Sequence, residues 1–481
     1  MTSDSSRAVA RAIVARLQQA GFAAFWVGGC VRDFLLGREP LDFDIATDAR
    51  PEQVETLFPK TIPVGKKFGV IIVIENGQQF QVATFRAEAD YQDGRRPETV
   101  VFANAGADAL RRDFTVNGLF YDPLTGKIHD WVGGEQDLRA KIIRTIGRPE
   151  ERFGEDHLRM LRAVRFAARL GFEIEPETFA AIQSLASKIK LISVERVRDE
   201  LIKLFAPPGR DRLNGLMAEG ISLEYRPGVV VPAQQSSQPA SSSAARGLIL
   251  LRDSGLLEHI LPELAATANC EQSPDFHPEG SVFNHLVLML GKMPAGASEC
   301  LPWAILLHDI AKPVTAERDV DTGKIHFYGH EKVGADMAET ILQRLRFSNQ
   351  QIAEIVTCVR NHMQFKDVKR MRKATLRRLL LRETFPLELE LHRLDCLGSC
   401  GDLTHYDFLV EQAEALKHLP AMRPPLLTGN DLIALGVKPG RELGALLAEI
   451  RERQLADDVT TPDEAKAWVR GKISHDPSAI D

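Results

Sequence analysis

Two aspartates one residue apart, Asp42 and Asp44, are the residues of this chain best suited to chemistry. They flank Phe43 in a run that ends in Ile45. If this run is a strand, residues i and i+2 face the same side, so both carboxylates project together. Paired carboxylate oxygens are ligands that Mg²⁺ prefers. The pair therefore predicts a magnesium site.

About a dozen residues earlier, Gly28 and Gly29 lie where an apolar strand is expected to turn into a helix. Glycine lets a phosphate approach the backbone, and a helix N-terminus favours an anion. Each signal is weak alone, because a glycine pair is usually a turn and a DxD is usually a solvated strand edge. Together they suggest a triphosphate cradle followed by a metal site, which is the arrangement needed for nucleotidyl transfer.

The elements that position these residues change character along the chain. Alternating strand and helix signals run through residues 22–145, with a β-hairpin that turns at Asn76-Gly77 and a polar loop at 90–102. From Arg148-Pro149 onward the patterns are helical, including a helix over 155–170 that stops at Gly171 and another over 193–205. Residues 225–245 are a Pro/Ser-rich linker or insertion.

Composition allows several domains, because the chain has 481 residues. The net charge of −6 does not indicate nucleic-acid binding. The basic runs at 139–169 and 366–382 are either RNA-binding surfaces or solvated helix faces. No segment has transmembrane length or the apolar core of a signal peptide. The six cysteines lack zinc-finger spacing, so we expect reduced core residues of a cytoplasmic protein. They are Cys30, Cys270, Cys300, Cys358, Cys396 and Cys400.

The helical middle of the chain is rich in histidine. Imidazoles and carboxylates on neighbouring helices can hold one or two divalent metals, and a metal-activated water can attack a phosphoester. The candidate ligands follow the order of an HD-type metal phosphohydrolase. They are His285, His308, Asp309, His330, His362 and Asp395. We expect a divalent transition metal there, and a cyclic or terminal phosphate on RNA is a plausible substrate.

Several ordered motifs resemble one known family. At GGCVRDFLLG, DFDIATD, RRDFTVNGL and EDHLRMLRAVRFAARLGF, the chain is similar to bacterial class II tRNA nucleotidyltransferases, which include CCA-adding enzymes and poly(A) polymerases. The segments ISVERVRDEL and LTGNDLIALGVKPG fit as well. The resemblance implies an α+β fold, in which a small mixed-sheet head precedes a helical neck, body, HD domain and tail. We place these domains at 1–147, 148–270, 271–410 and 411–481.

The resemblance also implies roles for individual residues. Asp42 and Asp44 would be catalytic and hold Mg²⁺, and CTP or ATP would bind among a set of glycine, basic and polar side chains. That set is Gly28, Gly29, Arg32, Arg112, Asp113, Asn117, Asp156, Arg159, Arg162 and Arg165. One departure is Gln81, at a position where the family usually carries an acid that completes the carboxylate set. Asp113 is a candidate substitute.

Choice between bases follows from hydrogen-bond chemistry. If Asp156 and Arg159 lie on one helix face, the carboxylate can accept from the exocyclic amine of cytosine or adenine and the guanidinium can donate to the ring nitrogen. Uracil and guanine carry a carbonyl oxygen in place of the amine, so two hydrogen-bond acceptors would face each other at Asp156. The unpaired groups would cost roughly 1–3 kcal/mol of binding free energy. The alternative is an ordinary i,i+3 ion pair. The loop at 90–102, with Asp93, Arg95 and Arg96, is expected to reposition the pocket between additions.

The leading hypothesis is therefore addition of CCA to tRNA 3′ ends. The alternatives are a poly(A) polymerase acting on other RNA, an enzyme that adds only CC or only A, and a phosphohydrolase that uses the head for RNA binding. The segment VGKKFGVIIV favours CCA addition weakly, because the polymerases tend to carry a more basic stretch there. No sequence feature indicates the oligomeric state.

Overall fold

The computed structural model describes residues 3–87, 101–209, 242–273, 277–417 and 425–475. Two compact units emerge, and each is described by itself. The first contains residues 1–270 with 286–302 and 341–347, and the second contains 271–285, 303–340 and 348–481. The predicted loop at 90–102, apart from Val101 and Phe102, and most of the predicted insertion at 225–245 lie outside the described residues.

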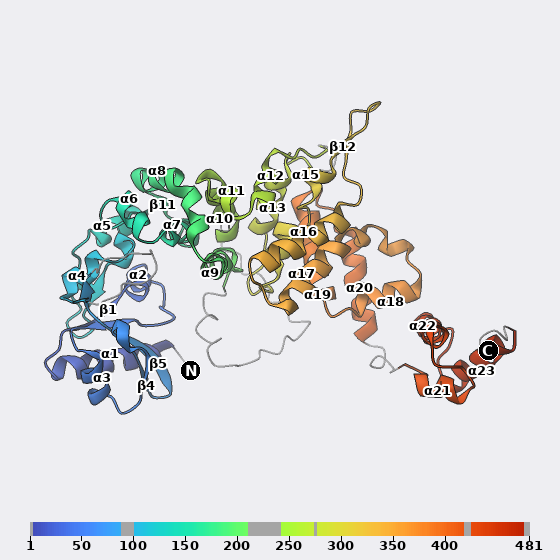
Figure 1. Ribbon diagram of the computed structural model, residues 1–481, viewed down its shortest axis with the longest axis horizontal. Coiled ribbons are helices and arrows are strands. Elements are labelled where there is room, and N and C mark those ends of the chain that lie inside the picture. Colours follow the sequence, from blue (N-terminus) through green and yellow to red (C-terminus); the bar gives the residue numbers. More distant parts are fainter. Residues whose placement is uncertain (1–2, 88–100, 210–241, 274–276, 418–424, 476–481) are drawn as a thin grey trace. The chain divides into compact units, whose positions relative to one another are not determined.

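The head is built on a mixed seven-stranded sheet with the order β3-β4-β5-β2-β1-β8-β9 (Figure 1). Strand β2 pairs in parallel with β5, whereas β1 pairs antiparallel with both β2 and β8. This confirms the predicted mixed-sheet head. The strands are β1 (Ala24–Val27), β2 (Ile45–Thr47), β3 (Thr61–Gly65), β4 (Val70–Glu75), β5 (Gln78–Thr84), β8 (Phe120–Tyr121) and β9 (Ile128–His129).

The predicted hairpin is strands β4 and β5, which pair antiparallel from Glu75↔Gln78 to Val70↔Ala83. Asn76 and Gly77 form its turn with φ angles of 52° and 74°. Positive φ at both central residues is the type I′ geometry that matches the twist of paired strands, and Asn-Gly adopts it at low cost. The turn therefore fixes the register that carries Gln81 to its place in the sheet.

Helices and short strands surround this sheet and extend from it. One face of the sheet packs into a core of Val27, Ala46, Phe85, Ala109 and Phe120. A short pair, β6 (Arg86–Ala87) with β7 (Val101–Phe102), lies beside α4. The helices of this region are α1 (Ser3–Gln19), α2 (Gly29–Leu35), α3 (Pro51–Leu57), α4 (Ala105–Leu110) and α5 (Gly134–Ala140), with 3₁₀ turns η1 (Lys66–Phe68) and η2 (Thr115–Asn117).

The rest of the first unit is helical, apart from β11 (Glu173–Ile174), which pairs in parallel with β10 (Ile142–Ile143). Helix α10 lies so close to α9 that a Cβ on Gly247 would approach Leu204 to 2.5 Å, so a side chain there would overpack the contact. The elements are α6 (Pro149–Glu155), α7 (Leu158–Leu170), α8 (Pro176–Leu185), η3 (Ala186–Leu191), α9 (Val194–Phe205), α10 (Ser243–Asp253), α11 (Leu256–Ile260), α12 (Pro262–Ala266) and η6 (Thr267–Asn269).

The second unit is also mainly helical. Its exception is the small hairpin of β12 (Glu317–Arg318) and β13 (Ile325–His326). The helices that form it or enter it are α13 (Val282–Gly291), α14 (Leu301–Leu307), α15 (Lys312–Thr315), α16 (His330–Arg344), α17 (Asn349–Asn361), η7 (His362–Arg370), α18 (Lys373–Leu380), α19 (Phe385–Gly398), α20 (Thr404–Lys417), α21 (Gly429–Ala434), α22 (Arg441–Ala456) and α23 (Pro462–His475). The boundary that we place at 410/411 falls inside α20.

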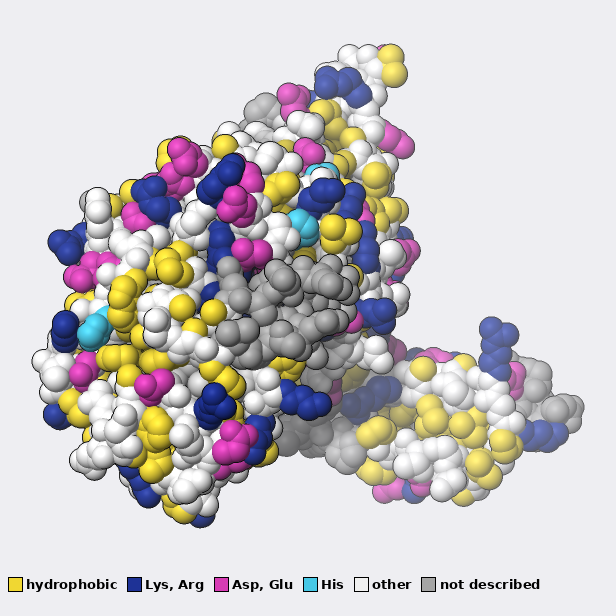
Figure 2. Space-filling model, turned by 60° about the vertical axis from the view of Figure 1, so that its left-hand side comes forward, with side chains coloured by type: hydrophobic (Ala, Val, Ile, Leu, Met, Phe, Trp, Pro, Cys, Tyr) yellow, Lys and Arg dark blue, Asp and Glu magenta, His cyan; other side chains and the backbone are white. Residues whose placement is uncertain are grey.

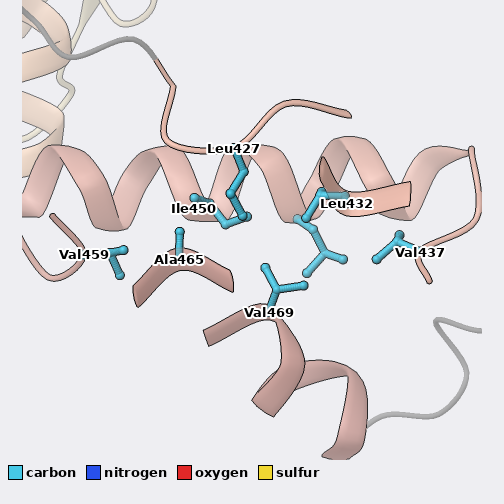
Figure 3. Packing of buried hydrophobic residues seen from close by; sticks show 8 residues of the cluster. Leu427, Leu432, Val437, Ile450, Val459, Ala465 and Val469 are labelled. Carbon is cyan, nitrogen blue, oxygen red and sulfur yellow. The ribbon is translucent and has the colours of Figure 1, made fainter. Parts of the chain in front are cut away.

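The C-terminal helices share a small core of their own (Figure 3). Thr428 caps α21 through a capping box with Asp431, which accounts for the LTGND motif as a helix start. The buried side chains are Leu427, Leu432, Val437, Leu446, Ile450, Val459, Ala465 and Val469. Among the described residues, no helix combines the length and apolarity needed to span a bilayer.

Many basic side chains of the two basic runs pair with acids, although four of the eight in the run at 366–382 have no ion pair among the described residues. Side chains of both signs are interspersed over the face shown in Figure 2. From the run at 139–169, Arg144 pairs with Asp137 and Arg148 with Glu151. From the run at 366–382, Arg382 pairs with Glu388. The prediction of basic RNA-binding surfaces therefore receives less support from the structure than from the sequence.

Candidate nucleotide-binding and metal sites

The sequence predicted that Asp42 and Asp44 lie on a strand. They lie instead in the segment just before β2. The carbonyl of Asp44 accepts from Val27 N at 3.0 Å, which prolongs the β1–β2 pairing by one residue. Phe43 is buried against Trp26, with 4.7 Å between ring centroids. Asp44 lines the cavity described below, whereas Asp42 is exposed and does not line it. The expectation that both carboxylates project together therefore stays a prediction.

The two carboxylates of this pair disfavour each other's charge. Burial and the neighbouring Asp42 raise the pKa of Asp44 from 3.8 to about 6, against the opposite influence of Arg112. Within the described residues, no side-chain hydrogen bond to the Asp44 carboxylate compensates for this cost. A divalent cation would relieve the repulsion directly. The donor set therefore fits Mg²⁺.

Gln81 occupies the sheet position next to this pair. The β2–β5 register pairs Ile45 with Val82, so Gln81 lies on the neighbouring strand beside Asp44. Both side chains line the same cavity. The position inferred for the missing acid is thus adjacent to the pair, and it carries an uncharged amide that can offer one oxygen.

Gly28 makes room for an arginine at the same cavity. Its φ is +74°, and a Cβ added there would meet Arg112 Nη1 at 3.0 Å. Arg112 is held by Asp108 through its Nη2 at 3.0 Å and lies over the Phe120 ring. Its remaining guanidinium edge therefore stays near the glycine pair, where a phosphate would approach.

Arg32 is the second fixed cation. It is buried, donates to Asn117 Oδ1 at 2.7 Å and forms an ion pair with Asp33 at 2.9 Å. Asn117 in turn donates to Asp113 Oδ1 at 3.2 Å. The motif RRDFTVNGL thus supplies Asp113 and Asn117 to one network with Arg32, whereas its Arg112 pairs with Asp108.

Asp113 is not placed to complete the carboxylate set. Its Oδ2 accepts two bonds from Arg162, at 2.7 and 2.9 Å, and its Oδ1 accepts from Asn117. Although burial opposes the charged form, the Arg162 guanidinium lowers the pKa of Asp113 below its usual value. Arg162 also contacts Glu200, which pairs with Arg165. Asp113 therefore anchors the head strands to α7 and α9, and the hypothesis that it assists the metal is not supported.

The predicted continuous helix through Asp156 and Arg159 is wrong. Helix α6 ends at Glu155, Asp156 has φ −150° and ψ 102°, and α7 begins at Leu158. Asp156 Oδ1 accepts from Leu158 N at 3.1 Å, a local bond that competes with helix continuation. Its Oδ2 pairs with Arg196 from α9 at 2.6 Å, whereas Arg159 pairs with Glu155. Asp156 and Arg159 therefore form no side-chain ion pair, and both face the cavity.

One cavity of about 570 Å³ collects nearly all of the head's predicted residues. Arg165 and Asp42 are predicted residues that do not line it. Arg86, Arg111 and Arg196 line it but were missed, and their only signal was their basic character near the motifs. The predicted residues that do line it are Gly28, Gly29, Arg32, Asp44, Arg112, Asp113, Asn117, Asp156, Arg159 and Arg162. The cavity thus presents glycines, a carboxylate and cations to one ligand.

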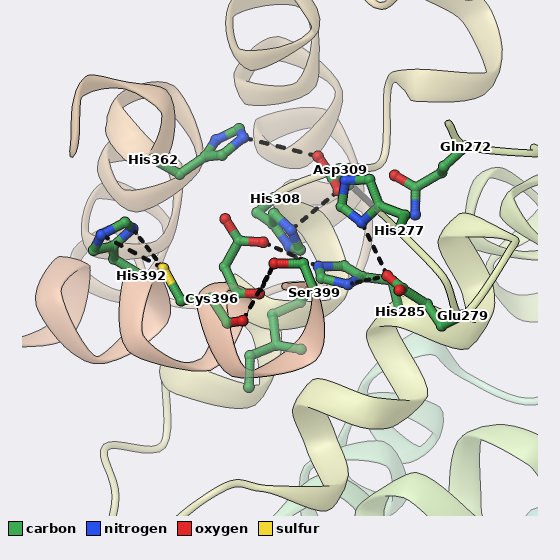
Figure 4. Close-up of polar contacts among 12 residues, drawn as sticks. Gln272, His277, Glu279, His285, His308, Asp309, His362, His392, Cys396 and Ser399 are labelled. Carbon is green, nitrogen blue, oxygen red and sulfur yellow. Dashed lines mark hydrogen bonds and ion pairs between the residues drawn. The ribbon is translucent and has the colours of Figure 1, made fainter. Parts of the chain in front are cut away.

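The second unit brings all six predicted HD residues together. Figure 4 shows four of them, His285, His308, Asp309 and His362. Asp309 lies at the centre, with His308 Nε2 at 3.2 Å, His330 Nε2 at 3.4 Å and His362 Nε2 at 3.8 Å. His285 Nε2 lies 3.1 Å from Asp395 Oδ1. Apart from the Asp395 side chain, which keeps some exposure, these side chains are buried.

Backbone carbonyls fix the orientation of three of these imidazoles. The Nδ1 atoms of His308, His330 and His362 lie 2.7–2.8 Å from the carbonyls of Ile305, Phe327 and Val359. A carbonyl can only accept, so each Nδ1 carries a proton, and in the neutral ring each Nε2 then presents a lone pair. This is the arrangement that orients metal-binding histidines.

The inward-facing nitrogens lie close to one another and to Asp309. His308 Nε2 is buried without a hydrogen bond among the described residues. His330 Nε2 and His362 Nε2 lie 3.2 Å apart. Burial and the neighbouring His308 lower the pKa of His362 to about 3, so the His362 ring is neutral. These nitrogens and the Asp309 carboxylate can serve one divalent metal, and the site fits one.

Sequence reasoning missed four residues of this cluster. Glu279 Oε1 lies 2.8 Å from His285 Nδ1 and 2.9 Å from His277 Nδ1. Lys312 Nζ pairs with Asp309 at 2.7 Å and donates to Gln272 at 2.6 Å. The signal was the segment FHPEGSVFNH, which carries His277 and Glu279 shortly before His285.

The cysteines form no disulfide among the described residues. Cys30, Cys270, Cys300 and Cys358 are buried, as expected of core residues. Cys396 is half-buried and Cys400 is exposed, so the expectation of a core position is wrong for Cys400.

Comparisons with known families match these regions one by one. Residues 24–144 match the poly A polymerase head domain, and residues 171–220 match the probable RNA and SrmB-binding site of polymerase A. Residues 282–397 match the HD domain. The sheet and its cavity are thus a nucleotidyltransferase head, and the histidine cluster lies in an HD domain.

Relatives and solved structures agree. The chain is 46% identical over 224 residues to the CCA-adding enzyme of Geobacillus stearothermophilus, and 47% identical over 196 residues to that of Staphylococcus aureus strain MRSA252. These matches cover 46% and 40% of this chain, and 55% and 49% of the relatives, so they span about half the relatives' length.

The fold matches over nearly the full chain. The crystal structure of the Bacillus stearothermophilus CCA-adding enzyme in complex with CTP covers 98% of both chains, with a TM-score of 0.69 and 27% identity. The Thermotoga maritima CCA-adding enzyme complexed with tRNA covers 97% of this chain and 95% of its own, with a TM-score of 0.55. At 17% identity, that likeness shows the fold alone. The chain therefore contains a poly A polymerase head domain, a region similar to the RNA-binding site of that polymerase and an HD domain, and its fold is that of the CCA-adding enzymes it resembles.

Proposed function

We propose that the chain adds CCA to tRNA 3′ ends from CTP and ATP. The observation that carries the proposal is the single cavity that joins the glycine pair, Asp44, two fixed arginines and Asp156 with Arg159. The curated relatives reported above are CCA-adding enzymes, and the Bacillus stearothermophilus structure, which covers 98% of this chain, is a complex with CTP. The Thermotoga maritima enzyme was solved with tRNA.

In the reaction, the 3′-oxygen of the RNA forms a bond to the α-phosphorus, the bond from that phosphorus to the bridging oxygen breaks, and pyrophosphate leaves. Mg²⁺ held by Asp42 and Asp44 would neutralise charge on the reacting oxygens. Arg32 and Arg112 line the cavity and would hold the triphosphate in place. Because their guanidiniums are already bonded to Asn117, Asp33 and Asp108, little side-chain freedom is lost on binding.

Base choice rests on Asp156 and Arg159. Arg196 and Leu158 N each engage one oxygen of the Asp156 carboxylate, and each carboxylate oxygen can accept a second bond. An exocyclic amine of cytosine or adenine can therefore donate to Asp156 while Arg159 donates to the ring nitrogen. A carbonyl in place of the amine would cost roughly 1–3 kcal/mol, or about ten- to a hundredfold.

The decisive assay uses tRNA transcripts that lack CCA, end in C, or end in CC, incubated with CTP and ATP singly and together. We expect growth to CCA followed by arrest. A long A-ladder on any RNA would instead identify a poly(A) polymerase, and arrest at CC would identify a partial enzyme. Asp42→Ala should abolish incorporation; if incorporation survives, the head is not the catalytic site.

We propose a second, metal-dependent phosphohydrolase activity for the HD domain. The observation that favours it is the set of preoriented histidines around Asp309. A divalent transition metal held there would activate water for attack on a phosphoester, such as a 2′,3′-cyclic or terminal phosphate on RNA. Asp309→Ala should abolish metal-dependent phosphate release and leave CCA addition intact. Loss of both activities would contradict independent sites.

A further inference from the structure

The HD domain contains a buried carboxylate, Glu279, that has no part in the phosphohydrolase activity as proposed above. It lies in the turn before α13, and its side chain is 6% exposed. Within the described part of the chain, no lysine or arginine pairs with it. Burying a carboxylate without a cation is costly unless hydrogen-bond donors replace the lost water. The groups that donate to Glu279 therefore indicate its role.

Two imidazoles supply those donors (Figure 4). Glu279 Oε1 lies 2.8 Å from His285 Nδ1 and 2.9 Å from His277 Nδ1. The His285 ring is fully buried, so water does not compete for its Nδ1. The His277 ring is 19% exposed and meets the His285 ring edge-on, with 5.1 Å between the ring centroids. One carboxylate oxygen thus holds a candidate metal ligand on one side and a partly exposed histidine on the other.

The backbone holds Glu279 in this position independently of the imidazoles. In the turn, Gly280 N donates to the carbonyl of His277 at 3.1 Å. The side-chain amide of Asn284 donates to the carbonyl of Glu279 at 3.1 Å, which ties the turn to the start of α13. Because His285 lies on the same helix, a short and fixed segment joins the carboxylate to the ring that it contacts.

His285 is held differently from the other histidines of the cluster. Backbone carbonyls accept from the Nδ1 atoms of His308, His330 and His362, whereas a carboxylate accepts from His285. Either acceptor fixes the ring and leaves Nε2 as the nitrogen that can bind a metal. A carboxylate does more, because it also raises the basicity of the ring as a ligand. The Nε2 atom of His285 lies 3.1 Å from Oδ1 of Asp395, which is another candidate ligand.

We propose that Glu279 is a positioning residue, which orients His285 and strengthens its Nε2 as a ligand of a divalent metal. The inference rests on the metal-dependent activity proposed for the HD domain. Glu279 acts through His285 and is not itself a ligand. Removal of its charge should therefore weaken metal binding and leave the fold in place.

A cobalt titration of the full chain tests the proposal. Co²⁺ is added to protein that carries Asp44→Asn, which removes the charged pair of the head, and binding is followed by visible absorption. Glu279→Gln keeps the size of the side chain and a hydrogen-bond acceptor but removes the charge, whereas Glu279→Ala removes both. We expect Co²⁺ to bind about tenfold more weakly in the first and up to about a hundredfold more weakly in the second. Phosphate release by Glu279→Gln should fall at limiting Co²⁺ and recover at saturating Co²⁺.

Two controls accompany the titration. Glu411→Gln makes the same chemical change at an exposed residue of α20 and should leave Co²⁺ binding unchanged. Asp309→Ala should lose the binding, which assigns the absorption signal to the HD domain. If Glu279→Ala does not fold, Glu279→Gln alone decides.

Thermal unfolding in a chelator separates positioning from a merely structural role. A structural role would lower the stability of the metal-free protein and leave the Co²⁺ affinity of the Glu279 variants equal to that of the wild type, and this result would overturn the proposal. If the wild type releases phosphate and the variants bind Co²⁺ equally well, only the role of Glu279 fails. If the wild type binds Co²⁺ and the variants bind it more weakly, the role of Glu279 holds even where no phosphate is released, and only the phosphohydrolase fails. A wild-type chain that binds no Co²⁺ would overturn both.

Discussion

Replacing Asp44 with asparagine should abolish nucleotide addition and, at the same time, stabilise the metal-free protein. The substitution keeps the shape of the side chain and removes its charge. Burial and Asp42 raise the pKa of Asp44 to about 6, so the native fold holds this charge at a cost. No side-chain hydrogen bond to the carboxylate is lost with it, among the described residues.

The size of the expected gain in stability follows from the shift in the Asp44 pKa. A rise from 3.8 to about 6 corresponds to about 3 kcal/mol in favour of the neutral form. Asp44 is half-buried, so solvent screening reduces this value, and we expect a gain of roughly 1–3 kcal/mol. Because each kcal/mol moves the midpoint by about 2–4 °C in a unit of 150–250 residues, the first thermal transition should rise by several degrees.

The pH dependence has a definite sign. Since the folded-state pKa is raised, the folded protein binds the proton more tightly, and wild-type stability falls as pH rises from about 4 to about 6. The variant lacks this dependence. The difference between the two proteins should therefore vanish near pH 4 and reach its full size above pH 6.

Thermal unfolding in a chelator at pH 4 and pH 8 measures the effect, and Mg²⁺ should then stabilise the wild type more than the variant. The reasoning fails if the variant is no more stable at pH 8, or if the difference persists at pH 4. Asp48→Asn is a control of the same chemistry on an exposed residue of the same segment. We expect it to leave addition intact.

Two further predictions test the residues that hold the side chains of the cavity in place. Arg162→Ala leaves the Asp113 carboxylate without its main partner, so it should lower the free energy of unfolding by on the order of 3 kcal/mol in urea titrations. Arg148→Ala, which breaks an exposed pair, should cost less than about 1 kcal/mol. Gly28→Ala forces a Cβ to within 3.0 Å of Arg112 and strains a φ of +74°, so KM for CTP should rise; an unchanged KM would mean that Arg112 does not hold the triphosphate.

Local chemistry made much of the head predictable from the sequence. Asn76-Gly77 specifies one turn type, and that turn fixes the register of β4 against β5. The DxD motif pointed to Asp44, which lines the cavity, although the pair precedes its strand and Asp42 does not line the cavity. The position of Gln81 followed from the order of motifs, and the parallel pairing of β2 with β5 puts it beside Asp44.

Partners chosen by tertiary structure could not be predicted in this way. Periodicity continues through Asp156, and the helix breaks there because the carboxylate bonds to Leu158 N and to Arg196, 40 residues along the chain. Asp113 looked free in the sequence and is held by Arg162, which lies 49 residues away. Glu279 was missed although it lies six residues before His285, because its role depends on the contact between the two side chains.

Both metal sites share one physical property. In the head, burial and the Asp42 carboxylate raise the pKa of Asp44, and in the HD domain the Nε2 atoms of His330 and His362 lie 3.2 Å apart beside Asp309. Each arrangement gathers groups that can bind a cation in a small space. A bound cation would favour the folded state of each site, so these residues serve the ligand rather than the fold. Variants that stabilise the metal-free protein at these positions should therefore be the ones that lose activity.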